Sequence, residues 1–336
     1  MNMNFAKDMS EHPGVQILTV LGLVSGATLD GLNKQEYFLW IAGMTGILLL
    51  IIAYLVSRER KVYDTEILPI PIVINIDSNE ATSYVLKNLF TQLEQDSKFK
   101  NLRNNLKRYR SIVENDLMFT YSGDLYDKER MISFMQLIKY QITKIKESVP
   151  NKVEFHLAYY KRPAYGIFLG YVFAEEDLVI YQNNPNEDLF NKVAEIKGRK
   201  HKNTINRYQK FDVKRISTDK NSDTLLIGIK AASHNINFNT PNLQKYTNII
   251  SFEAKHEGTI KLEEDWVQYV REIFTLLNEE QTKYKHITIA HAMPEAIAVM
   301  IGLAIGNYWS VMITQYEFGE GDYFDIFPTN HLKCYF

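Results

Sequence analysis

The sequence predicts an α/β protein of two similar halves with mainly parallel sheets, preceded by an α-helical transmembrane hairpin. An internal repeat predicts the halves: residues 153–181 and 286–313 each contain a short apolar strand, a proline-started apolar helix and a second strand. The prolines that start the two helices, Pro163 and Pro294, lie 131 residues apart. Because a repeat of this kind usually identifies the architecture, most of the chain after the hairpin is one half-domain used twice.

Strands and helices alternate in the same order in both halves of the soluble part, residues 62–336. The first half covers about residues 67–190 and the second about 222–336, with a basic connection at about 191–221. Such alternation predicts parallel sheets with right-handed crossovers.

The first strand of the soluble part is predicted at residues 72–76, after Pro69 and Pro71. Proline has no N–H to donate to a neighbouring strand. We therefore expect the residues before this strand to lie off the central ladder.

The first 60 residues contain two uncharged runs, at about 13–29 and 37–56, which predict the transmembrane hairpin. The second run has 20 uncharged positions, and as a helix it would span about 30 Å, the thickness of the hydrocarbon core. The first run contains more polar residues, so an interfacial helix is its alternative. Each run carries a pair of glycines that would let membrane helices pack closely, Gly22 with Gly26 and Gly43 with Gly46.

Charge predicts the orientation of the hairpin. Three positive residues directly follow the second run, namely Arg58, Arg60 and Lys61. The turn between the runs has one positive residue, Lys34. Because positive residues stay on the cytoplasmic side, we expect both termini and the soluble part in the cytoplasm.

The whole chain is nearly neutral, with 38 basic and 40 acidic residues, so its net charge does not indicate a polyanion-binding protein. Cys334 is the single cysteine, which excludes an internal disulfide. Two basic stretches, 98–110 and 197–215, are either solvated faces or surfaces for anionic lipid or a nucleotide. They have little aromatic interleaving, which argues against long nucleic acid as a partner.

Ligands of open parallel sheets bind beyond the carboxyl ends of the strands, where helices begin and free amides favour an anion. Lys161 and Arg162 would add positive charge there, while Tyr159, Tyr160 and His291 could stack on a base. Strand-to-helix loops occur in every α/β protein, so a purely structural role is the alternative. The candidate ligand-binding residues are Ser78, Tyr159, Tyr160, Lys161, Arg162, Lys230, Ser233, His234, His291 and Met293.

The chain carries none of the common catalytic or metal-binding motifs, including the phosphate-binding P-loop, the zinc-binding pair of histidines and the nucleophile elbow. We therefore expect no enzyme activity and no cofactor or metal. If the protein were a nuclease, its general acid or base would lie among Tyr159, Lys161, His234 and His291.

The two proline-led segments resemble a SAVED domain. The segment from Arg162-Pro163 to Gly170, followed by a strand ending Tyr181-Gln182, is similar to the first half of that family. Ala292-Met293-Pro294 with Gly302 is similar to the second half, although Leu303 stands where the family often has an arginine. The resemblance implies two fused CARF-like, Rossmann-type halves.

The same resemblance implies a function. SAVED domains bind cyclic oligonucleotides and sit on effectors of the anti-phage systems called CBASS. With two N-terminal spans, the chain resembles effectors that disrupt the bacterial inner membrane in abortive infection. The ligand would be a cyclic di-, tri- or tetranucleotide, and the other partners would be the lipid bilayer and further copies of the chain, joined head to tail. Two unequal halves also present unequal ends, which suits an open stack.

Two other functions stay open from the sequence. One is a membrane-bound nuclease that degrades a cyclic oligonucleotide, and the other is a non-catalytic, membrane-anchored scaffold that binds only protein.

Overall fold

The computed structural model describes most of the chain after the first predicted span, namely residues 34–76, 82–150, 152–184, 189–198, 200–219, 221–306 and 309–335. The predicted span at 13–29, with Gly22 and Gly26, lies outside the described residues, as does Ser78.

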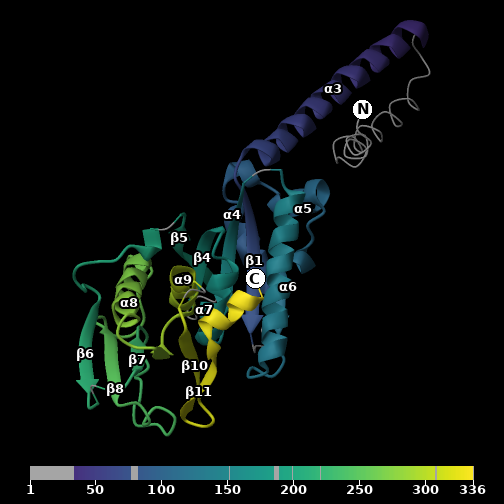
Figure 1. Cartoon of the computed structure of the whole chain (residues 1–336). Coiled ribbons are helices and arrows are strands. Elements are labelled where there is room, and N and C mark those ends of the chain that lie inside the picture. The colour runs from purple at the N-terminus through teal and green to yellow at the C-terminus, as the bar shows by residue number, and fades with distance from the viewer. Residues whose placement is uncertain are drawn as a thin grey trace.

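A single long helix, α3 (Lys34–Thr65), leads into the rest of the molecule and projects away from it (Figure 1). Residues Ile41–Arg58 are apolar and long enough to cross a membrane, and only 12% of this window is buried. Leu50, for example, is 71% exposed. A Cβ added at Gly43 or Gly46 would meet no other atom within 4 Å, so neither glycine packs against any described residue.

The first half is a five-stranded sheet in the order β2-β1-β3-β4-β5. All neighbours are parallel except β4 and β5. The strands are β1 (Leu68–Ile76), β2 (Met118–Tyr121), β3 (Val153–Tyr160), β4 (Asp177–Asn184) and β5 (Leu189–Ile196). Its helices are α4 (Thr82–Leu93), α5 (Leu102–Arg110), α6 (Lys128–Ser148) and α7 (Pro163–Val172), with the short 3₁₀ helices η1 (Ser97–Phe99) and η2 (Glu114–Asp116).

The second half is a six-stranded sheet in the order β11-β10-β9-β7-β8-β6, with antiparallel pairs only at its two edges. Its strands are β6 (Phe211–Ser217), β7 (Thr224–Lys230), β8 (Asn248–Ala254), β9 (His286–Ala292), β10 (Val311–Glu317) and β11 (Asp322–Pro328). Its helices are η3 (Lys200–Lys202), α8 (Trp266–Glu280), α9 (Glu295–Ile305) and η4 (Thr329–Cys334).

The two sheets repeat one strand order. Five strands of the second sheet, read as β8-β7-β9-β10-β11, follow the same sequence of crossovers as β2-β1-β3-β4-β5 in the first. The prediction of two similar α/β halves with mainly parallel sheets is therefore confirmed. Strand β6 has no counterpart among the described strands of the first half.

The expectation that Pro69 and Pro71 lie before the first strand is wrong. Both prolines belong to β1, which pairs with β3 from Leu68 to Asn75. The N–H of Leu68 faces β3, where it donates to Lys152, whereas that of Val73 faces β2, where it donates to Leu117. Because backbone nitrogens alternate in direction along a strand, the nitrogens of both prolines point to the β2 side. Strand β2 begins only opposite Val73, so among the described residues no partner lies opposite the prolines there. Neither proline therefore removes a hydrogen bond of the ladder.

The predicted connection at 191–221 is not a plain linker. Most of β5 and all of β6 lie within it, and both are edge strands that pair antiparallel to their neighbours. Charged residues on an exposed edge strand protect it from pairing with other chains. Some of the basic residues of the predicted connection therefore belong to two edge strands.

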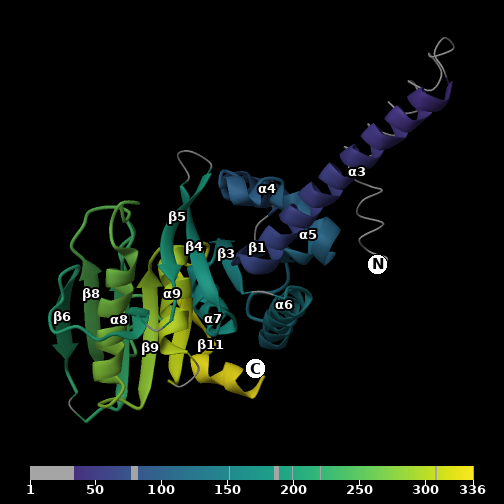
Figure 2. The ribbon, with the colours of Figure 1, turned by 90° about the horizontal axis from the view of Figure 1, so that it is seen from above.

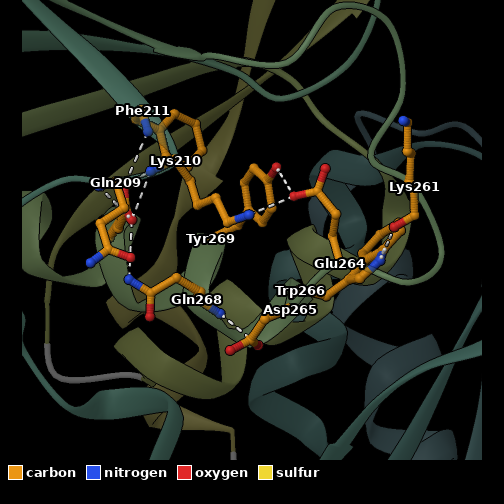
Figure 3. A network of polar contacts seen from close by, with 10 residues as sticks. Gln209, Lys210, Phe211, Lys261, Glu264, Asp265, Trp266, Gln268 and Tyr269 are labelled. Carbon is orange, nitrogen blue, oxygen red and sulfur yellow. Dashed lines mark hydrogen bonds and ion pairs between the residues drawn. The ribbon is translucent and has the colours of Figure 1, made fainter.

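A buried carboxylate attaches β6 to the second half (Figure 3). Glu272 of α8 is fully buried and accepts hydrogen bonds of 2.9–3.1 Å from the backbone N–H groups of Gln209, Lys210 and Phe211. The side chain of Gln268, one turn earlier, donates to the same carboxylate at 3.1 Å. These bonds fix the start of β6 against α8.

The two halves meet where α7 packs against α9. A Cβ placed on Gly170 would overlap the backbone of Val299 and lie 2.6 Å from the nitrogen of Leu303. A Cβ on Gly302 would overlap the carbonyl of Ile167 in the same way. Since Gly166 faces Ala298 and Gly170 faces Gly302, the helices run in the same direction, and their backbones touch only because both contacts lack a side chain.

This contact predicts the effect of adding one methyl group. We expect Gly302→Ala to lower the free energy of unfolding by about 3 kcal/mol, because backbone atoms of α7 cannot move as a flexible side chain can. The measurement is urea unfolding of the full chain in detergent. Gly319→Ala is the matched control, since a Cβ there meets no atom within 4 Å. Equal stability of the two variants would contradict the proposed contact.

Candidate functional site

The carboxyl ends of both parallel sheets face the same side of the molecule, because α7 and α9 run in the same direction and each begins where its preceding strand ends. In each sheet the direction of the crossovers reverses between two central strands. These strands are β1 and β3 in the first half and β7 and β9 in the second. Such a reversal is the usual place for a ligand in an open α/β sheet.

A cavity of about 400 Å³ lies at this position in the second half. Its walls come from the loop after β7, the ends of β9 and β10, the turn after β10, and the start of β11. The first half contributes Pro163, the first residue of α7. The lining residues are Pro163, Ala232, His234, Asn235, Asn237, His291, Ala292, Met293, Gln315, Tyr316, Phe318 and Tyr323.

Two side chains of this cavity hold buried polar atoms without a partner in the described structure. His291 is 7% exposed, and neither of its ring nitrogens makes a hydrogen bond there. Gln315 is 6% exposed; its amide nitrogen donates to the Tyr316 carbonyl at 2.8 Å, but its side-chain oxygen has no donor. Because buried polar atoms are nearly always paired, these atoms can accept or donate hydrogen bonds to a water molecule or a ligand in the cavity.

Burial sets the charge of His291. It lowers the pKa of the imidazole to about 4, and the nearby Thr314 carbonyl opposes the shift only in part. The ring is therefore neutral at pH 7, with one nitrogen as a donor and the other as an acceptor. A neutral imidazole beside an amide can match the donors and acceptors on the edge of a heterocyclic base.

Aromatic side chains form the rim of the cavity. Phe318 lies at the turn between β10 and β11, is 76% exposed, and meets the rings of Tyr316 and His234 at centroid distances of 5.1 and 6.1 Å. The ring of Tyr323 also packs against Tyr316, with a centroid distance of 5.0 Å. An exposed phenylalanine at a cavity mouth can stack on a planar ligand without moving the core.

Polar contacts join the two halves beside this cavity. Arg162, at the start of α7, binds both carboxylate oxygens of Glu317 at 3.0 Å, and Tyr126 donates to the same carboxylate at 2.8 Å. The reciprocal contact is made by Gln182 at the end of β4. It accepts a hydrogen bond from the Ala296 N–H at 3.0 Å and donates to Glu295 at 2.8 Å. Each half thus binds the start of the other half's central helix.

The structure corrects the expectation for Tyr159 and Tyr160, because each is only 1% exposed. The Tyr159 hydroxyl donates to the Arg162 carbonyl at 2.6 Å, and the ring of Tyr160 packs edge-on against Phe190. Both rings belong to the core, so neither can stack on a base in this structure. Tyr159 precedes Gly170 by 11 residues, as His291 precedes Gly302, so the two copies place different side chains at one position.

The predicted basic residues of the first half have different environments. Lys161 is exposed in the left-handed region, with φ of 65°, and does not line the cavity. The charge of Arg162 is directed to Glu317, so this arginine is a link between the halves in the structure. That assignment differs from the expected anion-binding role.

The predicted residues of the second half divide into two groups. His234, His291 and Met293 line the cavity together. Lys230, at the end of β7, lies 3.9 Å from Glu253, and Ser233 is exposed in the following loop. Neither of these two lines the cavity, and their ligand-binding role stays a prediction.

Four cavity residues, from the end of β10, the turn after it and the start of β11, are not among the predicted site residues. Gln315, Tyr316, Phe318 and Tyr323 all line the cavity. The strand at 310–313 was part of the recognised repeat, so its carboxyl end could have been placed beside that of β9. In the described ranges, no three His, Cys, Asp or Glu residues are grouped to hold a metal ion.

No protein-family model and no curated protein matches the chain. Among solved structures, it is similar to the Cap4 SAVED/CARF-domain containing receptor of Acinetobacter baumannii with the cyclic trinucleotide 2'3'3'-cAAA. That match has 13% identity and a TM-score of 0.49, over 86% of this chain and 61% of the receptor. The Cap4 receptor of Moraxella osloensis aligns with 12% identity and a TM-score of 0.42, over 89% of this chain and 66% of that one. The chain thus spans about three-fifths to two-thirds of the receptors' length.

The pKa of His291 predicts a pH dependence of stability. Above pH 6.5 the ring is neutral in both folded and unfolded chains, whereas between pH 6.5 and 4 only the unfolded chain takes up the proton. Stability should therefore fall by up to about 3 kcal/mol as the pH drops through this window. Urea unfolding of the wild type and of His291→Gln, compared at each pH, isolates this contribution. Parallel curves for the two proteins would show that His291 is not buried as described.

Proposed function

We propose that the protein is a membrane-anchored receptor of CBASS-type anti-phage defence, which senses a cyclic oligonucleotide without consuming it. The observation that carries the proposal is the cavity at the carboxyl ends of β7, β9 and β10, with unpaired polar atoms inside and aromatic rings at its rim. The sequence resemblance to SAVED domains supports the same ligand class.

The cavity suits the base of such a ligand. Its volume of about 400 Å³ falls within the usual range for small-molecule sites. Its lining contains no lysine, arginine or carboxylate, so it favours a neutral, planar group over a phosphate. His291 and Gln315 would pair with the base edge, and Phe318 would stack on its face.

The phosphates of the ligand would lie outside the cavity, toward the start of α7. Pro163 lines the cavity, and Lys161 is only two residues away, within about 7 Å along the chain. Lys161 is exposed, and its positive charge would favour an anion there. A ligand that contacts both elements would bridge the two halves.

We propose that ligand binding stacks copies of the chain head to tail, since unequal ends allow an open assembly. Stacking would gather the α3 helices, whose apolar residues are largely exposed. With both termini and the soluble part in the cytoplasm, the gathered spans would disrupt the bacterial inner membrane.

The ligand is tested by titrating the full chain in detergent with a panel of cyclic di-, tri- and tetranucleotides and then analysing the recovered nucleotide. We expect submicromolar binding of at least one member, recovered intact. Phe318→Ala and Gln315→Ala should each weaken binding by about tenfold, the loss typical of a base contact. Tyr140→Ala, which removes a ring that is 66% exposed on α6, is the control.

Two results would contradict the ligand proposal. Degradation of the nucleotide would instead support a nuclease, and no binding across the panel would support a scaffold that binds only protein.

The membrane mechanism is tested by placing one charge in α3. Leu50→Lys should abolish ligand-dependent leakage from vesicles and toxicity in cells, because a lysine at the centre of a span is costly to insert. Its affinity for the ligand should equal that of the wild type. Leu137→Lys, at a position 56% exposed on α6, makes the same change outside the span. If Leu50→Lys still causes leakage, the proposed mechanism is wrong.

A further inference from the structure

A basic surface surrounds α5 in the first half. Six basic residues and no acidic one occur between positions 98 and 110. Four of their side chains, which we call the α5 basic surface, are exposed: Lys98, Lys100, Arg103 and Lys107. The inner side of α5 is fixed in the core by Leu102 and Leu106, so its outer side has a defined orientation.

This surface lies next to the end of α3, where the chain enters the soluble part. Both views place α5 beside that end of α3 (Figures 1 and 2). An ion pair of 3.4 Å joins Lys98 to Glu66, directly after α3. The apolar window of α3 ends at Arg58, and the helix continues for seven residues to Thr65. At 1.5 Å per residue, the soluble part begins about 10 Å from the end of the apolar window.

Neighbouring carboxylates neutralise only part of this charge. Glu66 pairs with Lys98 and Glu114 pairs with Arg103, while Glu94 accepts a hydrogen bond from the Arg103 backbone. Lys100 and Lys107 form no ion pair with any residue in the described ranges, and both are exposed. Lys107 and Arg103 also line a shallow hollow of about 390 Å³.

The other basic stretch provides a contrast. In residues 197–215, Lys197 pairs with Glu154 at 3.0 Å, Lys210 with Glu264 at 2.6 Å, and Arg215 with the buried Glu280 at 2.8 Å. These bonds attach the stretch to the protein itself. Lys100 and Lys107, near α5, form no such bonds with the described residues.

We propose that the α5 basic surface binds anionic lipid headgroups and holds the soluble part against the membrane. The inference rests on the proposed membrane insertion of α3. The segment between the apolar window and the soluble part, about 10 Å long, is close to the screening length of about 8 Å at physiological salt. Each lysine near an anionic bilayer strengthens attachment by roughly fivefold. A bilayer fits better than nucleic acid, because α3 brings its headgroups to this surface.

The test uses the full chain, carrying Cys334→Ser and Asn104→Cys, with a polarity-sensitive fluorophore on the new cysteine. The protein is reconstituted in phosphatidylcholine vesicles with and without phosphatidylglycerol. We expect a blue shift only with the anionic lipid, reversed by salt. Lys100→Ser with Lys107→Ser should raise the phosphatidylglycerol content needed for half the shift by at least fivefold. Lys283→Ser with Lys285→Ser, which removes two exposed lysines after α8, should change nothing.

Alkaline extraction separates the two possible failures. If the wild type is extracted from the vesicles, α3 does not insert and the proposed membrane mechanism fails. If the chain stays inserted but the fluorophore does not respond to phosphatidylglycerol, the α5 inference alone is wrong. A fluorescence shift caused by single-stranded DNA in neutral vesicles, with no shift caused by phosphatidylglycerol, would identify a nucleic-acid surface. That result would also overturn the α5 inference.

Discussion

The backbone contact between α7 and α9 is the constraint on which the arrangement of the two halves depends. Gly170 and Gly302 occupy equivalent positions of the repeat, and each faces backbone atoms of the other helix. The contact brings the carboxyl ends of two separate sheets to one side of the molecule. It also aligns the starts of the two helices with the opposite sheets, so that Arg162 reaches Glu317 and Gln182 reaches Glu295.

This arrangement makes the cavity a shared site, although most of its wall belongs to the second half. Pro163 closes one side, and the Arg162–Glu317 pair holds the strand that continues into the exposed Phe318. A ligand that moves Phe318 would therefore act on a segment already attached to the first half. The cavity and the relative position of the halves are mechanically connected through these few residues.

Much of the fold could be predicted from the sequence, because an apolar repeat with a proline and a glycine at fixed spacing determines strand, helix and strand together. The errors arose where the environment depends on neighbours far along the chain. Pro69 and Pro71 are tolerated in β1 only because β2 begins later, and Tyr159 and Tyr160 are buried by Gly166 and Phe190. Of the candidate residues, His234, His291 and Met293 line the cavity, and their role in ligand binding stays a prediction, while Gln315 and Phe318 required the position of β10.

The difference between Tyr159 and His291 has a consequence for how such a molecule can change over generations. In a dimer of identical chains, every substitution appears twice, and a residue favourable in one subunit must also be tolerated in the other. Fusion of the two copies into one gene removes that restriction. One copy can keep a tyrosine that fills its core, while the other carries a small titratable ring beside an open space. Covalent linkage thus permits a division of labour between stability and recognition.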